Sequence, residues 1–186
     1  GRGPREFTED HDWLDSTLTW VAHLTGIWAM TALTAVVAIA LFAKNYRRPA
    51  LSTVAVMGAT ALITTGVKYL IGEDRPGWAN PPHTVVDHAF PSGHSSGIAA
   101  AAGVAIVLSA MLVRRRALRR LVTAAAVVVA LLVGADRILL GRFTLTDVDA
   151  GYLLGVTLVL IGLIVFDPRP RSIGLSTDPF PEAIPS

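Results

Sequence analysis

The sequence predicts an all-α membrane protein, a bundle of five transmembrane helices. Three observations support this fold class. The chain of 186 residues is 52% hydrophobic and only 16% charged, whereas about a quarter of the residues of a soluble domain are charged. It contains five apolar runs close to the ~20 residues that span a bilayer. None of these runs shows the strict alternation of a transmembrane barrel strand, so helices are the expected spanning form.

The expected spans follow one another along the chain. The first, residues 17–43, is free of Lys, Arg, Asp and Glu. The second covers residues 50–67. The third, residues 95–113, is rich in Ala and Gly, and small residues four apart, such as Gly93 and Gly97, indicate close helix packing. The fourth covers residues 121–135 and extends through residues 138–140, and the fifth covers residues 150–166.

The segments around the spans complete the domain organisation. Residues 1–16 are polar and acidic with an apolar pair, which predicts an interfacial segment on the membrane surface; a simple polar lead-in explains them equally well. Residues 17–166 form the transmembrane domain, and residues 167–186 form a Pro-rich tail. A sixth span is expected if the protein has a further segment before the printed sequence.

Basic residues predict the orientation of the bundle. The connections at residues 44–48 and 114–120 are short and strongly basic, so the positive-inside rule places both, and the tail, in the cytoplasm. The N-terminal segment, the loop at 72–93 and the turn at 141–147 then lie on the outer side.

Composition also argues against several function classes. Cysteine is absent, which excludes disulfides and thiolate metal sites, and no His and Glu spacing of the HExxH type predicts a metal. No basic patch interleaved with aromatic residues indicates nucleic-acid binding. A transporter is disfavoured because the charges cluster at one membrane face and not at the midplane.

Three polar groups interrupt the apolar pattern, all on the predicted outer side. Lys68 and Arg75 lie seven residues apart, about two helical turns. The third span is preceded by a Pro-Ser-Gly-His stretch, residues 91–94, where unpaired helix N–H groups favour an anion. The last group holds Arg137 and Asp147. Taken singly, the groups are explained by a snorkelling lysine, by a simple helix cap, and by an ion pair of Arg137 with Asp147 or of Asp136 with Arg142.

Together the three groups predict a phosphate site. Charges in membrane segments are costly and tend to be functional. Lys68, Arg75 and Arg137 supply a charge of +3 beside a helix N-terminus, and arginine binds phosphate oxygens with two parallel hydrogen bonds. His94 can act as a general acid near neutral pH. Because the site lies at headgroup level, a lipid phosphate is the expected ligand.

The motifs Lys-x6-Arg-Pro, Pro-Ser-Gly-His and Arg-x9-Asp, in this order, resemble the three-part signature of the type 2 phosphatidic acid phosphatase (PAP2) superfamily. The resemblance covers residues 17–166 and implies a PAP2-like bundle in the bacterial inner (cell) membrane, with the active site on the extracytoplasmic side. It also implies a metal-independent reaction without cofactor. The resemblance assigns phosphate binding to the following residues: Lys68, Arg75, Ser92, Gly93 and Arg137. It gives His94 the protonation of the leaving lipid oxygen.

Two positions depart from the family's pattern. The third motif begins with Asp136 where the family usually has Ser. More important, the resemblance places the nucleophilic histidine, which forms a phosphohistidine, at position 143, where this sequence has Phe143, and it makes Asp147 the residue that orients that histidine. Phenylalanine cannot attack phosphorus. An engineered His-to-Phe change and a natural pseudo-enzyme both explain Phe143, and the retained Asp147 favours the first. His83 and His88 precede the second motif, but their spacing does not indicate a substitute nucleophile.

The expected function is therefore a membrane lipid-phosphate phosphatase that is inactive with Phe143. Phosphatidic acid, phosphatidylglycerol phosphate, polyprenyl phosphates or diphosphates, and polyprenyl-phosphate sugar phosphates all fit as substrates. Two alternatives remain: a phosphotransferase that passes the phosphoryl group to another lipid or sugar, and a non-catalytic lipid-phosphate binding protein. Membrane lipids are the expected surroundings, and the sequence does not specify an oligomeric state.

Overall fold

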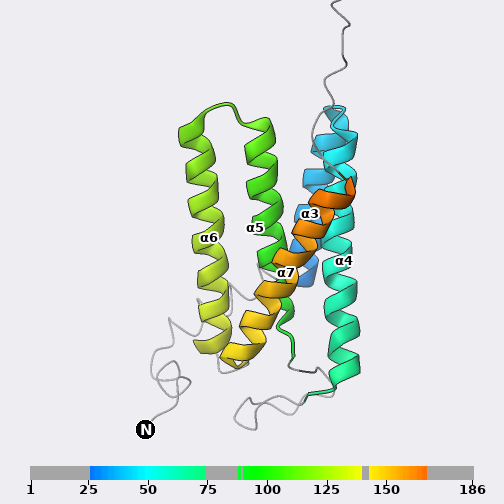
Figure 1. The fold of residues 1–186 in the computed structure, drawn as a ribbon, viewed down its shortest axis with the longest axis vertical. Coiled ribbons are helices and arrows are strands. Elements are labelled where there is room, and N and C mark those ends of the chain that lie inside the picture. Colours follow the sequence, from blue (N-terminus) through cyan, green and yellow to red (C-terminus); the bar gives the residue numbers. More distant parts are fainter. Residues whose placement is uncertain (1–25, 74–87, 89, 140–142, 167–186) are drawn as a thin grey trace, which may run out of the picture.

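The structure of the protein, a computed structural model, describes residues 26–73, 88, 90–139 and 143–166. In this part of the chain it contains five α-helices, which confirms the all-α fold class (Figure 1). Their bounds are as follows: α3 Ile27–Ala43, α4 Arg47–Ile71, α5 Gly93–Leu112, α6 Arg116–Leu139 and α7 Leu145–Phe166. The predicted segments 1–16 and 167–186, the start of the first span and Arg75 lie outside the described residues.

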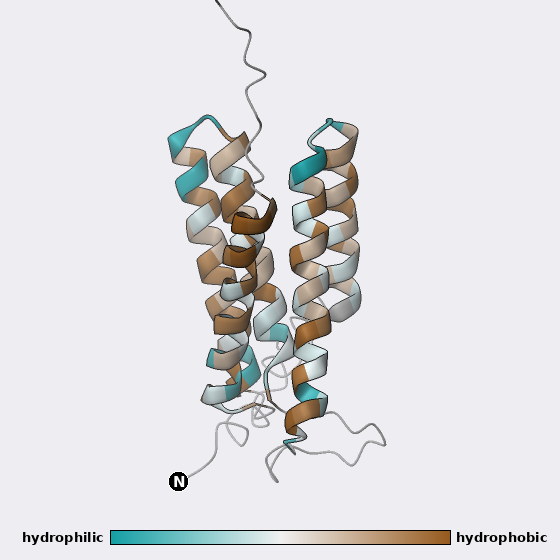
Figure 2. Ribbon diagram, turned by 45° about the vertical axis from the view of Figure 1, so that its right-hand side comes forward, coloured by the Kyte–Doolittle hydropathy of each residue, from teal (hydrophilic) through white to brown (hydrophobic). Residues whose placement is uncertain are grey.

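Four of these helices, α4 to α7, are long and apolar enough to cross a membrane, and α3 is a shorter apolar helix. Colouring by hydropathy shows apolar residues along the middle of the bundle and polar residues gathered near its two ends (Figure 2). Large apolar side chains such as Leu62, Leu132 and Ile164 are exposed. Exposed apolar side chains over the whole length of a helix are typical of contact with lipid, and the chain is a multi-pass membrane protein.

Helices α5 and α7 form the centre of the bundle. They make the most extensive contact with each other, α4 packs against both, and α3 packs mainly against α4. Helix α6 packs chiefly on α5 and lies at the edge, while α7 runs obliquely across the bundle (Figure 1). Because successive helices alternate in direction, the ends of α4 and α6 and the starts of α5 and α7 lie at the same end of the bundle.

Two glycines of α7 explain why α5 and α7 approach so closely. A Cβ atom at Gly151 would lie 2.7 Å from the carbonyl oxygen of Ser92, and one at Gly155 would lie 2.5 Å from that of Ser96. Both distances are shorter than any side chain tolerates against backbone, so glycine is required at this crossing. The sequence predicted close packing through Gly97 instead, but a Cβ atom there would meet nothing within 4 Å.

Helices α4 to α7 are longer than the apolar runs that predicted them. Helix α4 begins at Arg47 and continues past Lys68 to Ile71, and α6 begins at Arg116 within the basic connection. The predicted extension of the fourth span was correct, since α6 ends at Leu139. Hydropathy marks only the part of a helix that lies in lipid, whereas arginine is a good helix former and lets the helix continue into water.

Candidate active site

Four helix ends meet at one end of the bundle, and each provides polar residues. Lys68 lies in the last turn of α4, and Gly93 and His94 begin α5. Arg137 lies in the last turn of α6, and Asp147 lies in the first turn of α7. The fold therefore brings residues that are distant in sequence to the same level of the bundle.

The start of α5 is fixed by buried hydrogen bonds. Ser92 caps the helix, because its hydroxyl accepts a hydrogen bond from the backbone N–H of Ser95 at 3.4 Å and another from the Ser95 hydroxyl at 3.0 Å. The N–H of Ser92 donates to the carbonyl oxygen of Asp147 at 3.0 Å, which ties α5 to α7. A further bond of 2.9 Å joins the hydroxyls of Thr64 and Ser96 and ties α5 to α4. The first turn of α5 is thus held from both sides.

Lys68 is half-buried and turns toward the neighbouring helix ends. Its ammonium group lies 5.6 Å from the centre of the Phe143 ring and donates a hydrogen bond to the carbonyl oxygen of His88. Its Cε atom lies 3.9 Å from where a Cβ atom on Gly93 would be. The distance to the ring is within the range of a cation–π contact. The Lys68 side chain therefore contacts the neighbouring helix ends and does not extend toward water as a snorkelling lysine would.

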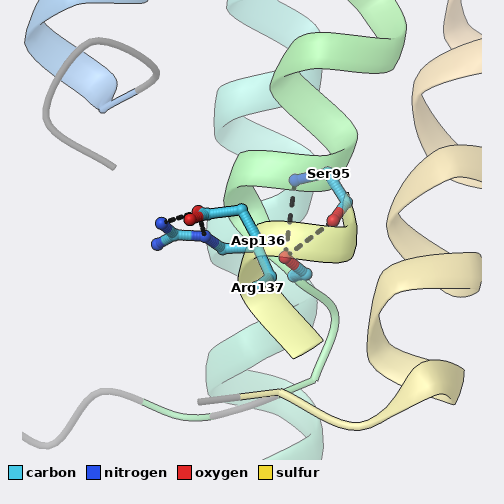
Figure 3. A network of polar contacts seen from close by, with 4 residues as sticks. Ser95, Asp136 and Arg137 are labelled. Carbon is cyan, nitrogen blue, oxygen red and sulfur yellow. Dashed lines mark hydrogen bonds and ion pairs between the residues drawn. The ribbon is translucent and has the colours of Figure 1, made fainter. Parts of the chain in front are cut away.

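Arg137 and Asp136 form a buried ion pair at the end of α6. Their side chains are 1% and 3% exposed. The Nε of Arg137 donates to Oδ2 of Asp136 at 2.9 Å, and Nη2 donates to the same oxygen (Figure 3). The two ion pairs considered from the sequence differ from this one: the pair of Arg137 with Asp147 is not the one that forms, and Arg142 lies outside the described residues. Adjacent helical residues do not usually face each other, so the sequence gave no reason to expect the pair of Asp136 with Arg137.

Asp147 is buried and caps its own helix. Its Oδ2 accepts a hydrogen bond from the N–H of Thr144 at 2.7 Å, and the Thr144 hydroxyl accepts one from the N–H of Asp147 at 3.3 Å. This reciprocal pair is a capping box with Asp in place of Glu. The second carboxylate oxygen, Oδ1, is buried and has no hydrogen-bond partner among the described residues. Because Asp147 is bonded to the peptide group that follows Phe143, this oxygen lies close to position 143.

A cavity of about 730 Å³ opens beside these groups. Its polar end is lined by Lys68, His88, His94 and Arg137, together with the ring of Phe143. From there it continues between α3, α4 and α5, along a wall that includes the following residues: Met30, Ala35, Val54, Met57 and Ala61. The cavity therefore combines a cationic end with a largely apolar body.

The predicted site residues have different places in this arrangement. Lys68, Gly93, His94, Arg137 and Phe143 line the one cavity. Ser92 and Asp147 are 0% and 1% exposed and support the helix starts behind it. Arg75 and His83 lie outside the described residues.

Sequence reasoning missed the role of Asp136 as the partner of Arg137. It considered His88 as a residue able to reach the site, but its spacing did not indicate a substitute nucleophile. In the structure His88 lines the cavity, its Nδ1 is buried, and its ring lies edge-on to that of Tyr69, with centroids 5.9 Å apart. In the described part of the chain, no group of three or more His, Asp or Glu side chains could hold a metal ion.

Comparison with known proteins agrees with the fold. The family model of the PAP2 superfamily matches residues 49–171. A crystal structure of a transmembrane PAP2 type phosphatidylglycerolphosphate phosphatase from Bacillus subtilis is similar, with a TM-score of 0.75 and 28% sequence identity over 87% of this chain and 81% of that chain. LpxE from Aquifex aeolicus shares the fold, with a TM-score of 0.60 and 22% identity over 83% of this chain and 87% of that chain. No curated protein matches the chain in sequence.

Proposed function

The chain belongs to the PAP2 superfamily, and from this membership we propose that it is an integral-membrane lipid-phosphate phosphatase whose printed sequence lacks the nucleophile. Its similarity to a membrane phosphatase that acts on phosphatidylglycerolphosphate supports the reaction class. The single observation that most supports the proposal is the cavity that Lys68, His94 and Arg137 line together with Phe143. A dianionic phosphate fits such an end, because Lys68, a helix start and Arg137, which is paired with Asp136, border it.

The shape of the cavity favours a lipid over a soluble phosphate ester. The lining residues Val54 and Lys68 are 14 positions apart on α4, which corresponds to about 21 Å along a helix. Most of the wall between them is apolar, so a hydrocarbon chain can lie there while its phosphate meets Lys68 and Arg137. We expect the lipid to enter sideways from the bilayer.

In the proposed site each residue has a distinct task. Lys68, Arg75 and Arg137 bind the phosphate oxygens and stabilise the charge that develops in the transition state, and the N–H of Gly93 adds a helix-start donor. Ser92 sets the geometry of that first turn through its bonds to Ser95 and Asp147. Its hydroxyl hydrogen, which these bonds do not use, is the donor that it offers to a phosphate oxygen. His94 gives its proton to the leaving lipid oxygen.

Because position 143 is phenylalanine, we expect the protein with the printed sequence to have no catalytic activity. The family's nucleophile at this position attacks phosphorus through an imidazole nitrogen, and a phenyl ring has no such atom. Oδ1 of Asp147, buried without a hydrogen-bond partner among the described residues, is the group that would accept a hydrogen bond from a histidine at 143 and orient its ring. The other residues of the family's site are present, which favours an engineered His-to-Phe change at position 143. A natural pseudo-enzyme is the second explanation.

The decisive experiment restores the nucleophile. Purified Phe143→His protein should hydrolyse short-chain phosphatidic acid or phosphatidylglycerol phosphate faster than the Phe143 protein by orders of magnitude, as expected when a nucleophile is regained. Adding Asp147→Asn should lower the activity of the Phe143→His protein by about 100-fold or more, because the orienting carboxylate is lost. The same Asp147→Asn change should leave the activity of the Phe143 protein unaltered.

The products of this assay separate the alternatives. Free phosphate released from labelled lipid indicates a hydrolase, and a second labelled lipid indicates a phosphotransferase. If Phe143→His protein remains inactive on every lipid phosphate while still binding one of them, the chain is a lipid-phosphate binding protein and the enzymatic proposal is wrong.

We further propose that the site faces the extracytoplasmic side of the bacterial inner membrane. The basic connections around Arg47 and Arg115 lie at the end of the bundle opposite His94 (Figure 1), and the positive-inside rule assigns such connections to the cytoplasm. A cysteine introduced at the exposed Leu145 should then react with a membrane-impermeant thiol reagent added to intact cells. One introduced at the exposed Arg115 should react only after lysis.

A further inference from the structure

A second cavity, of about 820 Å³, lies between α5 and α6 at the end of the bundle opposite the candidate active site. Three arginines line the end of this cavity that is nearest the basic connection: Arg116, Arg119 and Arg120. They project from the first two turns of α6, and Nη1 of Arg119 reaches across to the carbonyl oxygen of Ala110 in the last turn of α5, at 3.4 Å. The volume is within the roughly 300–1,000 Å³ that ligand sites occupy.

The charge of this cavity is not balanced by the described part of the protein. Residues 114–120 contain five arginines, and the first turn of α6 has no acidic residue. Within residues 26–73, 88, 90–139 and 143–166, no ion pair joins these arginines to a carboxylate. This second cavity, called the groove below, has several close cations and no described anion beside them, which favours an anionic ligand.

The lining changes from polar to apolar with depth. Thr123 follows the arginines along α6, and Val127 and Val128 follow Thr123. On the facing helix, Ser109 and Ala110 lie near the charged end and Ile106 lies deeper. From Arg116 to Val128 the distance along α6 is about 18 Å, a little more than half of the ~30 Å hydrocarbon core of a bilayer. The groove therefore has the length and the polarity gradient of one phospholipid in one leaflet.

We propose that this groove binds an anionic phospholipid of the leaflet that faces the basic connections, with its phosphate against Arg116, Arg119 and Arg120 and an acyl chain against Val127 and Val128. Basic pockets between transmembrane helices on the cytoplasmic side are suited to anionic headgroups. The site is separate from the substrate cavity at the other end of the bundle, and it does not depend on the proposed reaction.

The second basic connection offers a matched control. Arg47 and Arg48 lie at the same end of the bundle, but the guanidinium of Arg47 lies over the ring of Phe42, 5.6 Å from its centre, and neither arginine lines the groove. Replacing Arg47 therefore removes the same charge from the same membrane surface without touching the proposed site.

The test measures lipid retention by native mass spectrometry of the full chain in a neutral detergent, titrated with phosphatidylglycerol or with zwitterionic phosphatidylcholine. The unaltered protein should retain phosphatidylglycerol more tightly. Arg119→Gln should weaken that retention about fivefold, the effect of one arginine near an anionic headgroup, and Arg47→Gln should not. Ala124→Phe, at an exposed groove position, should weaken it without any change of charge, because the ring fills the apolar part.

The outcomes decide between a specific site and a general surface charge. If Arg119→Gln and Arg47→Gln weaken phosphatidylglycerol retention equally, only the general positive charge of the basic surface attracts the lipid. Retention unchanged by Ala124→Phe would show that the lipid does not enter the groove. Either result overturns the proposal. A far-UV circular dichroism spectrum checks that each variant keeps its helix content, and Arg119→Gln, which leaves four arginines in residues 114–120, keeps the proposal testable if Ala124→Phe does not fold.

Discussion

Replacing Asp136 by Asn should make the candidate active site bind phosphate more tightly. In the structure the Asp136 carboxylate accepts two hydrogen bonds from Arg137, one of them at 2.9 Å, and both side chains are almost completely buried. A phosphate that uses the same edge of the guanidinium must displace this carboxylate or share it. The carboxylate of Asp136 therefore competes with the ligand that the family resemblance assigns to Arg137.

The size of the effect follows from this geometry. A charge-assisted hydrogen bond contributes about 1.5–3 kcal/mol and is roughly twice as strong as a neutral one. An amide in place of the carboxylate keeps the shape but loses about half of one such bond, or about 0.7–1.5 kcal/mol. Phosphate affinity should rise by about 3- to 13-fold, since about 1.4 kcal/mol corresponds to a factor of ten.

Isothermal titration of the purified protein with inorganic phosphate measures this change directly. Asp149→Asn is the matched control, because Asp149 is exposed near the same end of α7 and its loss changes the local charge equally. Without phosphate, Asp136→Asn should melt at a lower temperature, since removing one partner of a buried pair is destabilising, and phosphate should raise its melting temperature more than that of the parent. If the phosphate affinity of Asp136→Asn is unchanged or weaker than that of the parent, or if Asp149→Asn raises it equally, Asp136 does not compete with phosphate for Arg137.

Two further predictions concern the packing that positions the site. Gly155→Ala should destabilise the bundle by about 1–3 kcal/mol, because its Cβ atom would lie 2.5 Å from a backbone oxygen. Gly97→Ala, whose Cβ atom would meet nothing within 4 Å, should not destabilise it. Equal losses of stability in the two variants, measured by denaturation in detergent, would contradict the close-approach explanation. Thr64→Val should cost about 1–2 kcal/mol by breaking the buried bond to Ser96. The double variant Thr64→Val/Ser96→Ala should cost less than the sum of its single changes, and strict additivity in the same measurement would show that the bond contributes nothing.

Much of the fold could be predicted because the determining forces are local. An apolar run of about 20 residues must form a helix in lipid, since every backbone polar group has to be bonded within the segment. For the same reason the polar residues stood out: Lys68, His94 and Arg137 interrupt apolar surroundings, and a charge there is costly enough to mark a site. The position of Asp147 in the first turn of α7 agrees with a local preference for carboxylates at helix starts.

The sequence by itself therefore determined the class of fold, the helices and the identity of the polar residues near one membrane face. Only the tertiary structure decided which of them share a cavity, that Arg137 is paired with the adjacent Asp136, and that one oxygen of Asp147 is buried beside Phe143. These features depend on how helices cross, and the crossing of α5 and α7 is set by backbone contacts at Gly151 and Gly155. Hydropathy and spacing describe each helix separately, whereas a cavity and a buried ion pair are produced by several helices packed together.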